Sequence, residues 1–303
     1  MKFDFVGKRY WYFTLSLVLL ILSLASVATQ GFNLGIDFTG GTLLDLKFSR
    51  PVTVIEVRGV LADYNLENSV IQLASTEQQQ DQSPNVLVRS HVLSEDERRQ
   101  VLTGFETKLG AFEVLRVEKV GAVVGSELTK QAIFALLISW ALMVVYIAYR
   151  FEFKFAVSGI VGVAYNVFIV IGAFSLLRKE IDASFVAALL TVVGYSINDT
   201  IVIFDRIREN LKTYKKSDGL EELVNRSIRQ TLTRSIYTVL TVLFAAGAIY
   251  LFGGETTKNF SLALIIGFVS GAYSSLFIAS QLWVSWRLYE DKQRLALKIK
   301  GSK

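Results

Sequence analysis

One acidic residue, Asp199, stands inside a run of apolar residues, 184–204, in a chain of 303 residues. About 20 apolar residues are enough for a helix to cross a lipid bilayer. A charged side chain at that depth costs about 2.5–3.5 kcal/mol on insertion scales, and such residues often carry protons or ions. Asp199 also lies only about 8 Å along a helix from the polar residues that begin at Asp205. An interfacial aspartate that caps the helix or binds a neighbour is therefore the alternative to a functional one.

The predicted helix around Asp199 has a polar face. Side chains three, four and eight positions before Asp199 lie on its side of a helix. Two further polar residues are its immediate neighbours in the sequence. These five residues are Ser196, Tyr195, Thr191, Asn198 and Thr200. We treat Tyr195, Ser196, Asn198 and Thr200, together with Thr238 of the next apolar run, as candidate polar support for the carboxyl group.

A fixed cation, Arg234, begins the next apolar run, and Tyr237, Thr238 and Thr241 share its helix face. Arginine stays protonated, so it can stabilise a carboxylate but cannot release a proton. Removal from water favours the neutral carboxylic acid, whereas a nearby guanidinium favours the carboxylate. A carboxyl group under both influences can carry a proton reversibly. The alternative is a static bridge between Asp199 and Arg234 that joins two helices, and spacing alone does not decide between the two.

The composition excludes several other kinds of site. The chain is 52% hydrophobic, and its apolar residues gather in long runs, which indicates a membrane protein. It contains no cysteine, hence no disulfide or Cys-ligated metal. The single histidine, His91, cannot build a histidine-rich zinc site and is predicted to be an ordinary strand or surface residue. With no nucleophile–base pattern, P-loop or metal motif, we expect neither an enzyme nor a cofactor.

Six apolar runs predict six membrane-spanning helices. They are residues 10–29, 132–149, 155–177, 184–204, 235–252 and 260–283. Lys and Arg gather in the N-terminal residues, the hydrophilic segment 205–233 and the tail 287–303. The positive-inside rule therefore predicts cytoplasmic N and C termini, and these basic clusters need no nucleic acid to explain them. Arg178 and Lys179, in a turn expected outside, count mildly against this orientation.

The residues between the first two spans, 31–125, predict a separate extracytoplasmic domain. Strand-like segments 42–48, 69–74, 85–92 and 112–120 alternate with two helices, and residues 78–84 read as a loop. The helices open at two capping boxes, Thr53 with Glu56 and Ser94 with Glu97, and end near Tyr64 and before Gly110. The order β-α-β-β-α-β predicts a small ferredoxin-like α+β domain. Residues 1–30 then form the N-terminus and first span, and residues 126–286 the other five.

Two further features of the spans indicate packing. The last span contains Gly267 and Gly271 at a spacing of four, which permits close helix approach. Asn166 in the third span is predicted to make a hydrogen bond between helices.

Several long motifs resemble one known family. Residues 35–41, with the sequence Gly-Ile-Asp-Phe-Thr-Gly-Gly, are similar to a signature of the SecD/SecF protein-export membrane proteins. Residues 193–209, 233–235 and 250–254 resemble the fourth and fifth spans of that family. The resemblance covers nearly the whole chain. It implies membership of the resistance-nodulation-division superfamily of proton-coupled membrane proteins.

The resemblance also implies a function, a location and partners. It implies a multi-pass protein of the bacterial cytoplasmic (inner) membrane that uses the proton motive force in late preprotein export, with protons as the coupling ion. Matching membrane residues of the family serve proton movement, which assigns that role to Asp199 and Arg234. The implied partners are a SecD-type subunit, the SecYEG channel, SecA and the emerging preprotein, with YajC and YidC as further candidates.

Two alternatives to this function remain. The chain could be a self-contained proton-driven exporter of drugs or lipids, although its outer domain of about 90 residues is small for a substrate pocket. It could also be a passive scaffold without proton chemistry.

In the loop motif, Gly35, Gly40 and Gly41 leave the backbone free to turn, and Asp37 could bind loop amides. We interpret that motif as a structural joint rather than as a substrate site.

Overall fold

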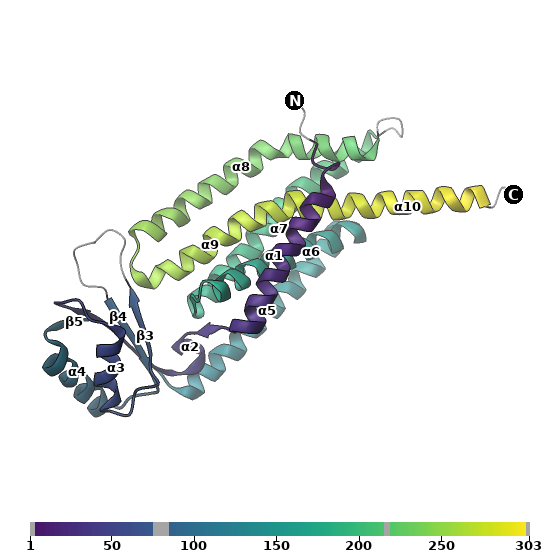
Figure 1. The fold of residues 1–303 in the computed structure, drawn as a ribbon. Coiled ribbons are helices and arrows are strands. Elements are labelled where there is room, and N and C mark those ends of the chain that lie inside the picture. Colours follow the sequence, from purple (N-terminus) through teal and green to yellow (C-terminus); the bar gives the residue numbers. More distant parts are fainter. Residues whose placement is uncertain (1–3, 75–84, 215–218, 301–303) are drawn as a thin grey trace. The chain divides into compact units, whose positions relative to one another are not determined.

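A computed structural model describes residues 4–74, 85–214 and 219–300 (Figure 1). The loop predicted at residues 78–84 lies outside these described residues. The chain divides into two compact units, Leu34–Ile133 and Met1–Asn33 with Phe134–Lys303. The first is a small α+β domain, and the second is a helical bundle.

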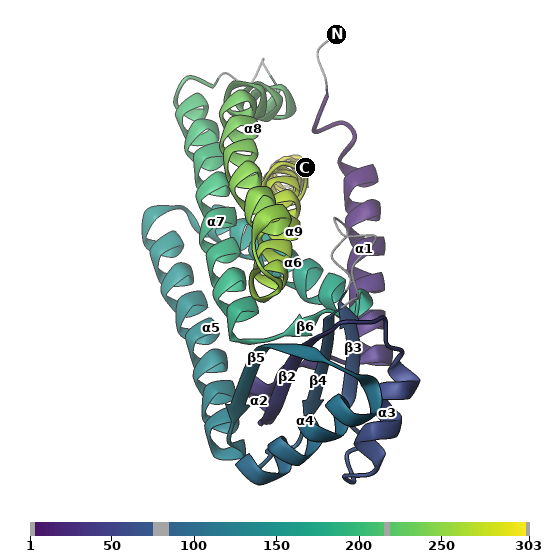
Figure 2. The same ribbon diagram turned by 90° about the vertical axis from the view of Figure 1, so that its left-hand side faces the viewer.

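The small unit contains a four-stranded antiparallel sheet with the strand order β3-β4-β2-β5. Its elements follow the chain in the predicted order β-α-β-β-α-β, the ferredoxin-like pattern. Their bounds are β2 (Gly41–Phe48), α3 (Val54–Ala62), β3 (Val70–Ala74), β4 (Asn85–Ser90), α4 (Glu95–Leu109) and β5 (Phe112–Val120). Figure 2 shows the strands and the two helices of this unit. The predicted small α+β fold between the first two spans is confirmed for the described residues, although β4 ends two residues earlier than expected.

Every second side chain of β2 packs against the helices of the small unit. Leu44, Leu46 and Phe48 of β2 are almost fully buried in one core with residues of α3 and α4. The ring of Phe48 meets that of Phe105 edge-on, with 6.0 Å between the centroids. Both predicted capping boxes are present, because Thr53 and Ser94 each accept from the backbone N–H of the glutamate three residues on. These caps fix where α3 and α4 begin.

The second unit contains the helices long and apolar enough to cross a membrane, apart from residues 122–133 of one of them, which belong to the small unit. The described residues hold six such segments. Their helices are α1 (Arg9–Gln30), α5 (Ala122–Arg150), α6 (Phe153–Leu176), α7 (Ala183–Lys212), α8 (Leu220–Phe252) and α9 (Glu255–Ser274), the last continued by a π-helical turn (Ser275–Ala279) and α10 (Ser280–Lys300). The two-residue strands β1 (Asn33–Leu34) and β6 (Glu180–Ile181) and the single turn α2 (Ile36–Thr39) are the remaining short elements. Six spans are thus confirmed.

Several helices are longer than their apolar runs. The segment 205–233, expected only to be hydrophilic, is largely helical, because α7 runs on to Lys212 and α8 already begins at Leu220. Ile207, Leu223 and Ile228 are buried there, so one apolar face sustains each extension. Likewise α5 begins ten residues before its apolar run, and α10 continues through the basic tail.

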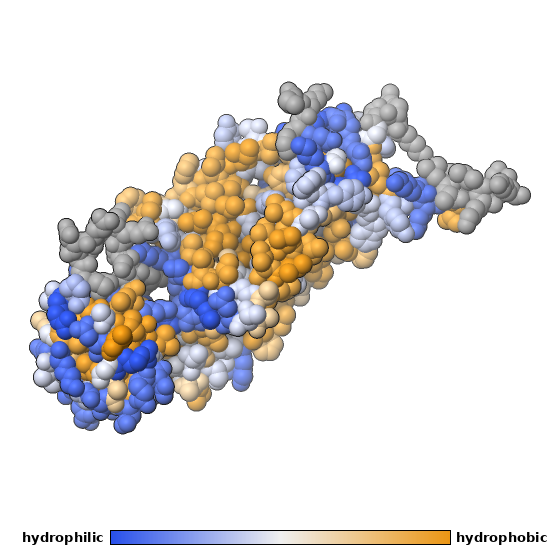
Figure 3. Space-filling view, in the orientation of Figure 1, coloured by the Kyte–Doolittle hydropathy of each residue, from blue (hydrophilic) through white to orange (hydrophobic). Residues whose placement is uncertain are grey.

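The helices of the bundle differ in how much of their apolar surface is covered. Within the most hydrophobic windows, about half of the residues are buried in α6, α7 and α9, but only 11% in α1, 6% in α5 and 17% in α8. The central packing includes the ring of Phe155 stacked on Trp283 at 4.5 Å. Figure 3 shows a largely hydrophobic surface over the bundle. The inner helices therefore include α7, which carries Asp199.

Candidate functional site

Asp199 is buried in the bundle and faces α8. Asp199 lies on α7, and only 7% of the residue is exposed. Ser235 of α8, 2% exposed, donates from Oγ to Oδ1 of Asp199 over 2.6 Å. The other carboxylate oxygen, Oδ2, is buried and has no hydrogen-bond partner among the described residues. A buried carboxyl group with one occupied and one unoccupied oxygen is able to bind a proton.

Arg234 does not bridge to Asp199. The structure places the Arg234 side chain on the exposed face of α8 and gives it no ion pair with Asp199 in the described chain. Thr238, on the same exposed face, donates back to the carbonyl oxygen of Arg234 over 2.9 Å. The static bridge considered from the sequence is thus not the arrangement found. Ser235, the residue after Arg234, lies on the packed face of α8, and its hydroxyl binds the carboxyl group instead of the guanidinium.

Ser235 is not part of the polar face predicted around Arg234, because the two side chains lie on different faces of α8. The buried face of α8 is instead marked by small and apolar residues at intervals of three, four and seven. These are Ile228, Thr231, Ser235, Val239 and Ala246. This spacing is typical of a packed helix face, so the sequence itself indicates that Ser235 lies on the buried side of α8.

The other polar candidates on α7 divide between two faces. Ser196 and Thr200 are buried, whereas Asn198 is exposed and is not brought to the carboxyl group. The ring of Tyr195 packs on Phe268 with 4.7 Å between centroids. Its hydroxyl is buried and has no hydrogen-bond partner in the described part of the chain. Tyr195, Ser196 and Thr200 thus belong to the interior around Asp199, and Asn198 does not.

The π-helical turn supplies a second polar link to α7. The Oγ atoms of Thr200 and Ser275 lie 2.8 Å apart, and Ser275 Oγ also donates to the Ser196 carbonyl oxygen over 3.3 Å. Ser280 donates to the Ser275 carbonyl oxygen five residues before it, over 2.8 Å. Such single π turns inside α-helices are frequent at functional sites. Here the π-helical turn binds α7 at Ser196 and Thr200, which lie within four residues of Asp199 in the sequence.

The packing predictions for the third and sixth spans are confirmed. Ser270 of α9 donates to Oδ1 of Asn166 of α6, the expected bond between helices. A Cβ atom on Gly271 would lie 2.9 Å from Nδ2 of Asn166, and one on Gly267 would lie 2.2 Å from Cγ2 of Val192. Both glycines therefore permit close helix approach.

The loop motif at residues 35–41 folds against the beginning of α5 within the small unit. Gly35 caps the single turn α2, and Asp37 lies in its first turn. Gly40 has a φ of +70°, and a Cβ atom on it would lie 2.9 Å from the Cα atom of Ala122. A Cβ atom on Gly125 would in turn lie 2.9 Å from the backbone nitrogen of Gly40. Gly41, with a φ of +139°, opens β2.

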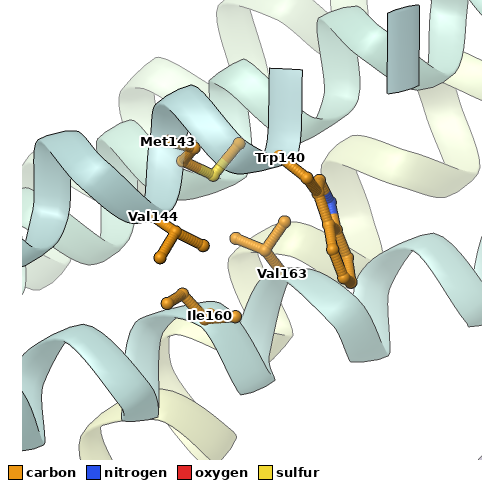
Figure 4. A pocket seen from close by; sticks show the side chains of 5 residues that line it. All are labelled: Trp140, Met143, Val144, Ile160 and Val163. Atoms are coloured by element: carbon orange, nitrogen blue, oxygen red, sulfur yellow. The ribbon is translucent and has the colours of Figure 1, made fainter. Parts of the chain in front are cut away.

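A small pocket elsewhere in the bundle offers no polar chemistry. It lies between α5 and α6 and is lined by Trp140, Met143, Val144, Ile160 and Val163 (Figure 4). All five side chains are apolar apart from the indole nitrogen. Among the described residues, no three His, Cys, Asp or Glu side chains lie together in a group that could hold a metal ion. The polar interior around Asp199 is therefore the leading candidate site.

Comparisons with known proteins agree on one family. Residues 100–289 match the family described as "Protein export membrane protein SecD/SecF, C-terminal", and residues 25–52 match the "SecD/SecF GG Motif". The chain is 52% identical over 286 residues to the protein translocase subunit SecF of Acidaminococcus fermentans, covering 94% of this chain and 98% of that protein. It is 36% identical to the protein translocase subunit SecDF of Bacillus subtilis, covering 96% of this chain but 39% of that longer protein.

Solved structures show the same fold. The crystal structure of SecDF from Thermus thermophilus, described as a translocon-associated membrane protein, matches with a TM-score of 0.86 and 39% identity. The match covers 95% of this chain and 39% of that one. A crystal structure of SecDF in a super-membrane-facing form matches with a TM-score of 0.71 and 37% identity, over 98% of this chain and 40% of that one. The chain therefore belongs to the SecD/SecF family of protein-export membrane proteins, among its SecF translocase subunits.

Proposed function

We propose that the chain couples the proton motive force to a late stage of preprotein export. Asp199 takes up and releases protons inside the bundle, and Arg234 influences how readily it does so. The resulting cycle of protonation acts on the small α+β domain, which holds the emerging polypeptide and limits its return.

The observation that carries this proposal is the state of the Asp199 carboxyl group. It is buried in a membrane-spanning helix and keeps one oxygen without a partner in the described chain. An ionised carboxylate in apolar surroundings is costly unless it is paired with a cation, whereas a protonated one is cheaper. Arg234 makes no ion pair with it, so among the described residues no ion pair compensates the charge on Asp199. Proton binding and release is the reaction that such a group supports best.

A SecD-type partner fits the exposed apolar helices. The hydrophobic windows of α1, α5 and α8 are mostly uncovered in the isolated chain. Lipid covers part of that surface in a membrane, and a second set of spans would cover another part. The relatives named SecDF are more than twice as long as the region matched here, which supports a two-part assembly.

We further propose that both termini are cytoplasmic and the small domain is outside. The support is the excess of Lys and Arg in the termini and in residues 205–233. A reporter active only outside the cytoplasm should give signal when inserted at Gln80, and none when fused after Lys303. The opposite pattern would reverse the proposed topology.

The function itself is tested by preprotein transport into inverted membrane vesicles that contain or lack this chain. Vesicles with the chain should complete transport faster when a proton gradient is imposed, and a crosslinker on the small domain should capture the preprotein at that stage. An equal response to the gradient in vesicles without the chain would contradict the proposal. Co-purification with a SecD-type protein would separate it from the alternative of a self-contained exporter.

A further inference from the structure

Ser235 is the group in direct contact with the proposed proton carrier. Its Oγ lies 2.6 Å from Oδ1 of Asp199, and both residues are buried between α7 and α8. Hydrogen bonds to a charged group are shorter and stronger than neutral ones. This bond therefore restrains the rotation of the Asp199 side chain.

Among the described residues, the hydroxyl of Ser235 donates to Asp199 and to no carbonyl of its own helix. Thr238 and Thr241, in the next turns of α8, each donate to a backbone carbonyl of that helix, over 2.9 and 2.8 Å. Ser235 instead donates across to α7. A carboxylate oxygen accepts this bond, and the carbonyl oxygen of a protonated carboxyl group accepts it as well. The bond can persist through a cycle of proton uptake and release.

The two oxygens of Asp199 are therefore not equivalent. Oδ1 is occupied by Ser235, whereas Oδ2 is buried and without a hydrogen-bond partner in the described residues. We propose that Ser235 is a positioning residue that holds Oδ1, so that Oδ2 is the oxygen that takes up and releases the proton. This inference rests on the proposed function of Asp199 as a proton carrier.

The step is a simple proton transfer. A hydronium ion from the aqueous side gives a proton to a lone pair of Oδ2, an O–H bond forms, and neutral water is left behind. The carboxylate becomes neutral, and release to water on the other side reverses the step. Ser235 neither gives nor receives a proton in either direction. Its role is to fix which oxygen reacts and where that oxygen lies.

Infrared difference spectroscopy of the complete complex in lipid tests this assignment. The band of the protonated Asp199 carbonyl is the one that disappears in Asp199→Asn. Ser235→Ala removes the hydrogen bond to Oδ1, so that band should move to higher wavenumber, whereas Ser235→Thr, which keeps a hydroxyl, should leave it close to its original position. Thr241→Val is the matched control, since its hydroxyl bonds only to its own helix.

Export measurements on the same variants separate positioning from a structural effect. Ser235→Ala should lower proton-driven export by about tenfold or more, comparable to losing one hydrogen bond to a charged group, and Ser235→Thr should restore most of it. An Asp199 band that does not move in Ser235→Ala would overturn the role of Ser235 while leaving the proton carrier intact. The absence of any Asp199-dependent band would overturn both proposals.

Discussion

Asp199 and Arg234 lie on two helices that pack together, α7 and α8, but their side chains form no ion pair in the described chain. The partner of Asp199 is Ser235, one residue beyond Arg234. The guanidinium is exposed, and the carboxyl group is buried. The effect of removing one charge by mutation can therefore be measured independently of the other.

The first prediction uses that separation. Removing one member of a buried ion pair leaves an unpaired charge, and removing both recovers part of the lost stability. Because no pair is present, the effects of Asp199→Asn and Arg234→Met on thermal unfolding of the purified complex should add, with a coupling energy below about 0.5 kcal/mol. Recovery of about 1 kcal/mol or more in the double variant would show a bridge.

For export, Arg234→Lys should be milder than Arg234→Met, since lysine keeps the charge.

A second prediction concerns the contact between the loop motif and α5. A Cβ atom on Gly125 would lie 2.9 Å from the Gly40 nitrogen, whereas one on Gly121 would meet nothing within 4 Å. Gly125→Ala should therefore destabilise the small unit by about 1–3 kcal/mol, the usual cost of overpacking. Gly121→Ala is its matched control and should change little. Hydrogen exchange of the β2 amides in the complete chain measures both, and equal effects would rule out this contact as the cause.

The third prediction is a pH dependence at the start of α4. The pKa of Glu97 is lowered, chiefly because the backbone N–H of Ser94 donates to its carboxylate and then because the Ser94 hydroxyl does. A carboxyl group with a lowered folded pKa stabilises the fold above its unfolded pKa of about 4.3, and that stabilisation is lost as the pH falls through the folded value. Exchange protection of the first-turn amides should therefore fall in acid.

Two variants check the cause of that pH dependence. Glu97→Gln should have lower protection at neutral pH and little further loss in acid. Ser94→Ala should cost about 1 kcal/mol, as expected for an N-cap residue. If Glu97→Gln shows the same acid transition as the unmodified chain, another group is responsible.

The fourth prediction concerns the N-terminal segment. Oδ1 of Asn225 accepts from the backbone nitrogens of Phe5 and Val6, over 2.8 and 3.1 Å, and its Nδ2 donates to Asp4 over 2.8 Å. Asn225→Ala removes the side-chain acceptor of two buried N–H groups, at a cost of about 1–3 kcal/mol. The exposed neighbour Arg226 provides the control Arg226→Ala. Faster proteolysis before Val6 is expected in Asn225→Ala alone.

Asn225→Asp should be more harmful than its small change in shape suggests. It keeps an acceptor for Phe5 and Val6 but places a second carboxylate against Asp4. The pKa of Asp4 is lowered, first by the N–H of Gly7 and then by Asn225, so Asp4 is ionised at neutral pH. Release of the N-terminal segment should then be greater at pH 7 than in acid, where the carboxylates are protonated. A release that does not vary with pH would argue against this repulsion.

Local signals predicted the small domain well. The pairs Thr53–Glu56 and Ser94–Glu97 determine where two helices begin through bonds within four residues, and β5 matches the predicted segment at both ends. Hydropathy was less informative about helix ends. It detects only the membrane part of α5, whose first turns carry Glu127 and Lys130 and are nevertheless helical.

The site was predicted only in part, for a geometric reason. Helical periodicity showed which residues share a face with Asp199, but not how far α8 is rotated toward it. That rotation follows from packing along Ile228, Val239 and Ala246, and it turns Ser235 inward and Arg234 outward. The π-helical turn at Ser275 likewise depends on contacts with α7 that no local pattern records.

The most direct measurement of the central claim is export by Asp199→Asn complexes in proteoliposomes with and without an imposed proton gradient. Asparagine keeps the shape of the side chain and can accept from Ser235, but it cannot bind and release a proton. The variant should insert and assemble with its partner, carry out ATP-driven transport at the normal rate, and show no acceleration by the gradient. Normal acceleration in Asp199→Asn would contradict the assignment of Asp199 as the proton carrier.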